Sequence, residues 1–260
     1  MYTDCHCHPY DLAEVFKEYD EERKRLGVLA AASSCFIEEL EYINDSFIPC
    51  FAIHPQLPAM YIKNNELQIE KKLNEHLQII NNLAKDKKIS AIGECGFDLF
   101  NDLYKETESY QDKIFASQLE IALQYDLPIV LHVRKAMFKI FKLSKFLSKC
   151  KSVIFHSWSG TYEEAASLLN CGVNAYFSFG NTIKLNHKQA IRSCSLLPAD
   201  RLLTETDAPY QPQRGKQFSS WSDLPLILET AAALRSTVGN IITKDELEKQ
   251  IELNFRKVFH

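Results

Sequence analysis

The sequence predicts a closed barrel of eight parallel β-strands alternating with helices, in a single domain that spans residues 1–260. Three observations lead to this prediction. Short apolar, β-branched runs recur along the chain, helical patterns follow most of them, and no linker rich in Gly, Ser or Pro divides the sequence. Alternating strands and helices are typical of parallel sheets with crossover helices. Eight such units in 260 residues favour a (β/α)8 TIM-type barrel over an open sheet.

The expected strands are eight apolar runs at residues 1–5, 28–32, 48–53, 89–93, 128–131, 152–155, 173–177 and 201–206. Between them, apolar residues recur at helical spacing over 106–126. Thr161 and Thr243 each stand three residues before a glutamate, and this capping-box pattern predicts the start of a helix at both. The least regular stretch, 209–222, is expected to form a surface loop near the exit of the last strand.

Composition and charge exclude several functional classes. With 46% hydrophobic and 25% charged residues the chain resembles an ordinary globular domain, and its net charge of −4 argues against a protein that coats DNA through a basic surface. The eight cysteines include no CxxC pair, which argues against a zinc ribbon or a thioredoxin-type site. No apolar run is long enough to span a bilayer, and the first residues do not resemble a signal peptide. We therefore expect a cytoplasmic protein with reduced thiols. Nothing in the sequence demands more than a monomer, which is the expected state.

Six potential metal ligands lie at the ends of the expected strands or directly after them: His6, His8, Glu94, His132, His156 and Asp207. In an extended strand alternate side chains share a face, so His6 and His8 are expected on one face and Cys5 and Cys7 on the other. Imidazole and carboxylate groups suit zinc, and carboxylates also suit magnesium and manganese. Six ligands are too many for one tetrahedral ion and about right for two ions that share a carboxylate.

Each of these residues also has a purely structural interpretation. Glu94 at the end of a buried strand needs a partner, which is either a cation or an ordinary hydrogen bond or ion pair. A single strand-end histidine such as His132 is more often a hydrogen-bonded core residue than a ligand. Two of them, together with the paired histidines near the N-terminus, favour a metal centre. Glu205 shares the alternation parity of Asp207 and is expected to support the ligands rather than to bind an ion.

Six motifs follow one another along the chain: HCH at 6–8, FAIHP at 51–55, AIGECGFD at 91–98, LPIVLHVR at 127–134, HSWSG at 156–160 and LTETDAPY at 203–210. Their content and order resemble those of the TatD-related deoxyribonucleases, a family of the amidohydrolase superfamily of metal-dependent barrels. The resemblance covers nearly the whole chain, and the last motif and the glutamate-containing motif are its most specific parts. It implies a TIM-type barrel with a metal site at the C-terminal ends of its strands.

The resemblance also implies two divalent metal ions, whose identity as zinc, magnesium or manganese stays open. One ion would be held by His6, His8, Glu94 and Asp207, and the other by Glu94, His132 and His156. Glu94 would then bridge the two ions with its two oxygens. His54 would contact the scissile phosphate or its leaving side, and a structural histidine fixed by Pro55 is an equal alternative.

The expected chemistry is hydrolysis of a phosphodiester by a metal-activated water, with Asp207 as the proton acceptor and Glu94 as the other catalytic carboxylate. Candidate contacts to flanking phosphates are Arg134, Arg214 and Lys216. Candidates for stacking on an unpaired base are Tyr210 and Trp221. Solvated surface charge and packing against the barrel rim are the alternatives for these residues. With the resemblance, we expect 3′–5′ exonuclease action on DNA that is single-stranded or frayed at its end. Abasic-site cleavage, removal of 3′ blocking groups and action on RNA stay open as alternatives.

The chain departs from the usual pattern of the family at positions that are not expected ligands. Lys135 replaces the acidic residue that commonly follows the arginine, and Ser157 and Trp158 replace a Cys-Phe pair. These differences bear on substrate preference rather than on hydrolysis. The main alternative is a hydrolase of a small-molecule amide, lactone or phosphoester on the same barrel, although many such relatives bridge their metals with a carbamylated lysine, where this strand carries Glu94. A non-catalytic binding protein and a thiolate-metal store are weaker alternatives.

Overall fold

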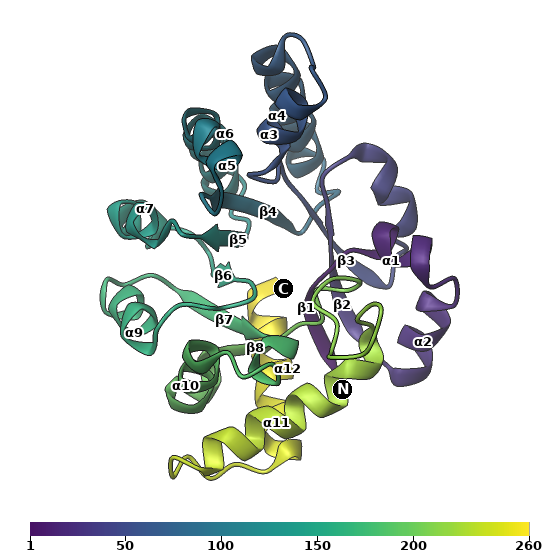
Figure 1. The fold of residues 1–260 in the computed structure, drawn as a ribbon, viewed down its shortest axis with the longest axis vertical. Coiled ribbons are helices and arrows are strands. Elements are labelled where there is room, and N and C mark those ends of the chain that lie inside the picture. Colours follow the sequence, from purple (N-terminus) through teal and green to yellow (C-terminus); the bar gives the residue numbers. More distant parts are fainter. Residues whose placement is uncertain (260) are drawn as a thin grey trace.

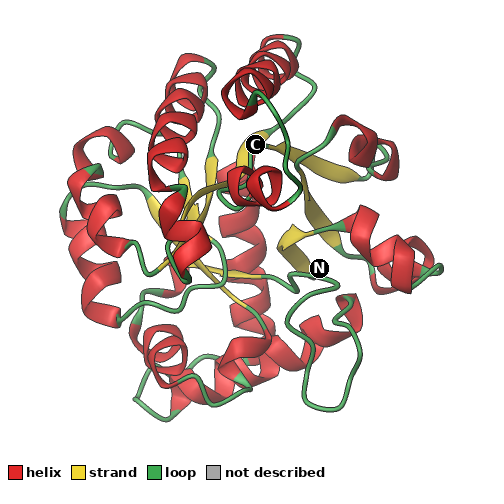
Figure 2. Ribbon diagram, turned by 45° about the horizontal axis from the view of Figure 1, so that its top comes forward, coloured by secondary structure: helices red, strands yellow, loops and turns green. Residues whose placement is uncertain are grey.

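The computed structural model describes residues 1–259, which form a barrel of eight parallel strands with helices around it (Figures 1 and 2). The strands are β1 (Thr3–Cys7), β2 (Leu29–Ser34), β3 (Phe47–Phe51), β4 (Ala91–Asp98), β5 (Ile129–Arg134), β6 (Val153–Phe155), β7 (Ala175–Phe179) and β8 (Leu202–Thr204). Their order in the sheet is their order in the chain. Each strand overlaps one of the eight predicted runs, and the (β/α)8 barrel expected from the sequence is confirmed.

Helices follow the strands and cover the outside of the barrel (Figure 2). The α-helices are α1 (Pro9–Val15), α2 (Tyr19–Leu26), α3 (Leu57–Lys63), α4 (Ile69–Lys85), α5 (Asp102–Glu106), α6 (Glu108–Gln124), α7 (Met137–Lys142), α8 (Ser144–Leu147), α9 (Tyr162–Asn170), α10 (Lys188–Leu196), α11 (Leu224–Ser236) and α12 (Lys244–Phe259). Short 3-10 helices are η1 (Ile37–Tyr42), η2 (Asn181–Ile183), η3 (Ala199–Arg201) and η4 (Trp221–Asp223). None of the helices within residues 1–259 combines the length and the apolar character needed to cross a membrane.

A layer of apolar side chains fills the inside of the barrel. It comprises Cys5, Ala31, Ile48, Cys50, Ala91, Val130, Ile154, Tyr176 and Leu203, together with Phe255, Val258 and Phe259 of α12. The last turns of α12 therefore pack into one end of the barrel, and the end of this helix lies near the middle of the ring in Figure 1. This leaves the opposite end, where the strands finish, for a site.

The barrel closes where β8 returns next to β1. The hydroxyl of Thr204 in β8 donates to the carbonyl of Thr3 in β1 at 2.7 Å. Just beyond the end of β8, the backbone N–H of Asp207 donates to the carbonyl of His6 at 3.0 Å. Closure of the barrel thus brings the last sequence motif beside the first, although they are about 200 residues apart in the chain.

Both predicted capping boxes are present. The Thr161 hydroxyl accepts from the N–H of Glu164 at 3.1 Å, and the Glu164 carboxylate accepts from the N–H of Thr161 at 2.8 Å. Thr243 and Glu246 make the same pair of bonds at 3.2 and 2.9 Å. These bonds satisfy N–H groups that have no partner inside the helix, so α9 and α12 start where the sequence predicts. The irregular loop expected at 209–222 is also present, interrupted only by η4.

Two details of the strand predictions are wrong. β4 continues past Glu94 to Asp98, so Glu94 lies within a strand and not at its end. Cys5 and Cys7 do not share a face: Cys5 lies in the barrel interior, whereas Cys7 packs in an outer cluster with Trp221. The pairing of β1 with β2 shifts register between Asp4 and Cys7, which breaks the simple alternation of side chains. All eight cysteines are free thiols.

Candidate metal centre

Polar side chains form the layer that follows the apolar interior of the barrel. In four consecutive strands the interior residue is followed, two positions later, by a polar residue: Val130 by His132, Ile154 by His156, Tyr176 by Ser178 and Leu203 by Glu205. Because side chains alternate along a strand, residues two apart point to the same side. The same periodicity that buries the apolar layer therefore directs these polar groups into the open end of the barrel.

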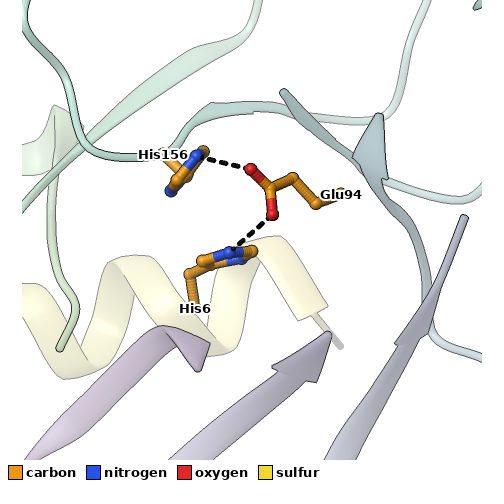
Figure 3. Close-up of side chains that lie close together, drawn as sticks. All are labelled: His6, Glu94 and His156. Carbon is orange, nitrogen blue, oxygen red and sulfur yellow. Dashed lines mark ion pairs between the residues drawn. The ribbon is translucent and has the colours of Figure 1, made fainter. Parts of the chain in front are cut away.

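One oxygen of Glu94 faces three histidines from neighbouring strands and loops. Oε1 of Glu94 lies 2.6 Å from Nδ1 of His132, 2.8 Å from Nε2 of His156 and 3.3 Å from Nε2 of His54. Glu94 and His156 are almost fully buried, and His54 and His132 are partly exposed. Figure 3 shows His156 pointing at this oxygen.

The other oxygen of Glu94 faces the two N-terminal histidines. Oε2 of Glu94 lies 3.2 Å from Nε2 of His6 and 3.7 Å from Nε2 of His8 (Figure 3 shows the contact with His6). The same two nitrogens lie 3.6 and 3.4 Å from Oδ1 of Asp207. The structure thus brings all six predicted ligands together, and Glu94 stands between two groups of them, each group facing one of its oxygens.

Two glycines of β4 allow the close approach that places Glu94 beside β5. A Cβ atom on Gly93 would lie 2.4 Å from Cβ of Val130, and one on Gly96 would lie 2.3 Å from the carbonyl oxygen of His132. Gly96 also has a φ of +132°, which side-chain-bearing residues rarely adopt. Larger residues at these positions would separate the two strands and move Glu94 away from His132.

Asp207 is held by the strand that carries the N-terminal histidines. Besides the backbone bond between Asp207 and His6, the buried carboxylate of Asp4 accepts hydrogen bonds from the N–H of Thr206 at 3.0 Å and its hydroxyl at 2.6 Å. Burial raises the pKa of Asp4 to about 7, although these hydrogen bonds oppose the shift. Through its hydrogen bonds with Thr206, Asp4 fixes the segment that presents Asp207.

Burial and mutual attraction set the charges in the cluster. Burial would raise the pKa of Glu94, but His156, His54 and His6 outweigh it, and the pKa of Glu94 lies well below its usual range. Burial lowers the pKa of His6 to about 4. Burial also opposes protonation of His156, but the attraction of Glu94 prevails and raises the pKa of His156 to about 10. An ionised carboxylate among imidazoles that compete for protons is an environment in which a cation can replace those protons.

The donor atoms fit a metal centre. Nε2 of His6 lies 3.1 Å from Nε2 of His8, and Nε2 of His156 lies 3.3 Å from Nδ1 of His132. Two ring lone pairs at this separation need a proton or a cation between them. Within residues 1–259, three overlapping sets of potential ligands have donor atoms within 4.8 Å of one another: His6, Glu94 and His156; His6, His8 and Asp207; His54, Glu94 and His132. Mixed imidazole and carboxylate sets suit zinc, manganese or magnesium.

Two carboxylates lie behind the imidazoles, and one of them, Asp98, orients the ring of His132 by a hydrogen bond. Asp98 is fully buried, and its Oδ2 lies 3.1 Å from Nε2 of His132. The amide of Gln56 donates to the same oxygen at 2.7 Å. Oε2 of Glu205 lies 3.8 Å from Nδ1 of His156, beyond hydrogen-bonding distance, and accepts instead from the hydroxyl of Ser178. Asp98 was not among the site residues predicted from the sequence. Its position carried a signal, since Asp98 and Glu94 are four residues apart in one strand and therefore share a face.

A cavity of about 770 Å³ opens above the cluster. His54, Arg134 and Tyr210, three of the candidate substrate contacts, line it. The guanidinium of Arg134 stacks on the ring of Phe100 at 4.0 Å, and Phe100 is 53% exposed. Tyr210 donates through its hydroxyl to Asp11 at 2.9 Å, and its ring is half exposed. These side chains form an aromatic and cationic rim.

Three other candidates lie elsewhere. Arg214 and Lys216 are on the exposed loop after β8, outside the residues that line the cavity. Nζ of Lys216 lies 2.6 Å from Oδ1 of the buried Asp223, so its charge anchors the loop. Trp221 is fully buried against Phe47, so it packs inside the protein, which was the alternative to stacking on a base. A tryptophan between serines in a polar loop carries no periodic signal that would have shown its burial.

Comparison with known families and proteins agrees with this geometry. A family model described as TatD related DNase matches residues 3–260. A protein of Pantoea ananatis named 3′-5′ ssDNA/RNA exonuclease TatD is 32% identical over 185 residues, which cover 68% of this chain and 68% of that protein. A protein of Mycoplasma pneumoniae named uncharacterized metal-dependent hydrolase is 30% identical over 219 residues, 80% of this chain and 76% of that protein.

A solved structure shares the fold over almost the whole chain. The crystal structure of YJJV, a TatD homologue from Escherichia coli K12, superposes with a TM-score of 0.82 at 23% identity, covering 99% of this chain and 97% of the other. At that identity the likeness concerns the barrel itself.

Proposed function

The chain belongs to the TatD related DNase family, and on that premise we propose that it is a metal-dependent nuclease that hydrolyses phosphodiester bonds of DNA. In finer detail, we propose 3′–5′ exonuclease action on single-stranded or frayed ends by a monomer that binds two divalent ions. The observation that carries this proposal is the position of Glu94, whose two oxygens face two separate groups of ligands.

The proposed ligands divide between the two oxygens of Glu94. Beside Oε2 are His6, His8 and Asp207, and beside Oε1 are His132 and His156. When bound, two divalent ions would polarise the phosphodiester and make water nucleophilic near neutral pH. His54, which also lies beside Oε1, lines the cavity and is proposed to contact the phosphate or its leaving side.

Asp207 is the proposed proton acceptor. Burial would raise its pKa, but its hydrogen bond with His8 and the nearby His156 and His6 outweigh burial and hold the pKa of Asp207 below its usual value. It is therefore ionised at neutral pH and able to take a proton from an attacking water. Asp207 lines the cavity, which supports access of water and substrate to its carboxylate.

The rim supports binding of an unpaired strand. Arg134 is the proposed contact to the phosphate next to the scissile bond, since it lines the cavity. Exposed Phe100 and Tyr210 provide ring faces on which bases can stack. Arg214, on the exposed loop, is proposed to contact phosphates farther along the strand, with Lys216 as its weaker neighbour because of the ion pair to Asp223.

The proposal is tested by removing metal ions with a chelator and then restoring Mg²⁺, Mn²⁺ and Zn²⁺ separately. Oligonucleotides of both polarities, labelled at the 5′ or the 3′ end, report the products, and a panel of lactones and cyclic amides tests the small-molecule alternative. We expect mononucleotides released from the 3′ end of single strands, and only after a metal is restored. Full activity of the stripped protein, or turnover of the small molecules alone, would refute the proposal.

A further inference from the structure

Gln211 connects Asp207 to Ser157 through its side-chain amide. Nε2 of Gln211 lies 2.6 Å from Oδ2 of Asp207 and 2.7 Å from Oγ of Ser157, and the hydroxyl of Ser157 lies 3.1 Å from Oε1 of Gln211. An ionised carboxylate only accepts hydrogen bonds, so the group of Gln211 that faces it is the NH2. The amide therefore donates to Asp207, and the serine braces it from the other side.

The backbone is left-handed at all three of these residues. The φ angle is 47° at Ser157, 54° at Asp207 and 52° at Gln211. Residues other than glycine adopt this region at a cost, and they keep it where the surrounding structure fixes them. The backbone of Gln211 is fixed from the neighbouring loop, because Nδ2 of Asn181 donates to its carbonyl at 3.1 Å. Strained residues joined by one hydrogen-bond chain indicate that the direction of their side chains matters.

Because of the hydrogen bond from Gln211, the two oxygens of the Asp207 carboxylate have different surroundings. Oδ1 of Asp207 faces the imidazoles of His6 and His8 at 3.6 and 3.4 Å, whereas Oδ2 faces the amide of Gln211 at 2.6 Å. Without that donor the carboxylate is free to rotate and to turn either oxygen towards the cluster. With it, Oδ1 points at the cluster and Oδ2 keeps one lone pair free for a proton.

We propose that Gln211, braced by Ser157, is a positioning residue that fixes Asp207 so that Oδ1 alone is presented to a metal ion. This inference rests on the proposed function, because it assumes that Asp207 is a ligand. It goes beyond it by assigning a role to a glutamine that follows the last motif and to a serine at which the chain departs from its family. Hydrogen-bond partners of ligands typically contribute about 10- to 100-fold in metal affinity or activity.

The test is Gln211→Met, which keeps the length of the side chain and removes the donor. In a calorimetric titration of the metal-free protein with Mn²⁺ or Zn²⁺ alone, the variant should bind one ion about 10- to 100-fold more weakly than the wild type does. Its affinity for the other ion should be unchanged. On single-stranded DNA, kcat should fall more than KM rises, because the substrate contacts remain. Ser157→Ala should shift the same ion in the same direction by less, and the double variant should lose less than the sum.

Gln213→Met is the matched control, since Nε2 of Gln213 donates to Asp223 at 2.5 Å in the same loop and has no hydrogen bond to Asp207. It should leave both metal affinities unchanged. If Gln211→Met binds both ions as tightly as the wild type and only KM rises, Gln211 is a substrate contact and the inference is wrong. If the wild-type protein binds metal but hydrolyses no nucleic acid, the proposed function fails, and the two affinities still decide the role of Gln211.

Discussion

Asp98 and the metal-ligand candidate His132 are joined by a hydrogen bond of 3.1 Å between Oδ2 and Nε2, while Nδ1 of the same ring lies 2.6 Å from Glu94. The buried Asp98 is itself fixed, because it accepts from the amide of Gln56 at 2.7 Å and from the N–H of Phe100 at 2.9 Å. A carboxylate behind a ligand histidine keeps the proton on the far nitrogen and leaves the near nitrogen free to bind a metal.

Asp98→Asn should therefore lower metal affinity or activity by about 10- to 100-fold, because an amide neither attracts the proton on Nε2 nor holds the ring as firmly. The measurements are calorimetric metal binding and turnover of single-stranded DNA. Asp102→Asn is the control, since the side chain of Asp102 is 93% exposed in the segment that follows. Equal loss in both variants would mean that the segment, rather than the hydrogen bond, is responsible.

Glu94 and Asp207 should respond differently to substitution. Glu94→Ala removes the carboxylate that faces both groups of ligands, so the protein should lose both ions. Asp207→Asn keeps an oxygen near one group and removes the proton acceptor, so it should reduce turnover more than metal content. Elemental analysis after gel filtration gives the metal content. Two ions still tightly bound in Glu94→Ala would show that Glu94 is not the bridge.

The barrel and the convergence of the proposed ligands were predictable because both follow from the two-residue alternation of side chains along each strand. His132 follows interior Val130 by two residues, and His156 follows interior Ile154 by two. An apolar strand that ends in a histidine of the same parity therefore directs that histidine into the mouth of the barrel. Parallel strands finish at the same end, so such residues meet without any further information in the sequence.

Departures from regular alternation were not predictable. Glu94 faces the site from within β4, where the pairing with β5 shifts register between Ile92 and Cys95. The apolar run at 89–93 contains no pattern that predicts this shift. Loop residues carry no period at all, so the burial of Trp221 and the contact of Gln211 with Asp207 depend on tertiary packing. The Lys216 ion pair is of the same kind, since Asp223 is buried only by the folded loop.

Phe100 should contribute to the binding of unpaired DNA. Its exposed ring stacks on Arg134, which lines the cavity, and stacking of a base on such a ring contributes about 1–3 kcal/mol. Phe100→Ala should raise KM for single-stranded DNA and leave kcat nearly unchanged. The effect should disappear on oligonucleotides whose terminal residues lack bases, since nothing is left to stack. Phe146→Ala is the control, because Phe146 on α8 is 52% exposed, and the cation over its ring is Lys149, which, unlike Arg134, does not line the cavity.

Stability should fall on mild acidification partly through His76, which is remote from the proposed ligands. Its ring packs edge-on against Phe36 and Tyr61, and its Nδ1 is buried without a hydrogen-bond partner. Burial lowers the pKa of His76, although Glu38 and Glu75 oppose the shift. Because the unfolded chain binds a proton on this histidine at a higher pH than the folded protein does, the contribution is present at neutral pH. It is lost as pH falls from the unfolded pKa towards the lowered folded pKa.

His76→Gln removes this titration and keeps a polar side chain. Urea unfolding of the wild type and the variant, both in the presence of a chelator, at pH 7.5 and pH 5 isolates the contribution of His76. The histidines of the proposed metal site titrate in both proteins, so their effect cancels in the difference. The wild type should lose more stability than the variant on acidification, so its advantage over His76→Gln shrinks at pH 5. A difference that stays constant with pH would mean that His76 has the same pKa in the folded and unfolded states, and that its burial between Phe36 and Tyr61 does not restrict its protonation.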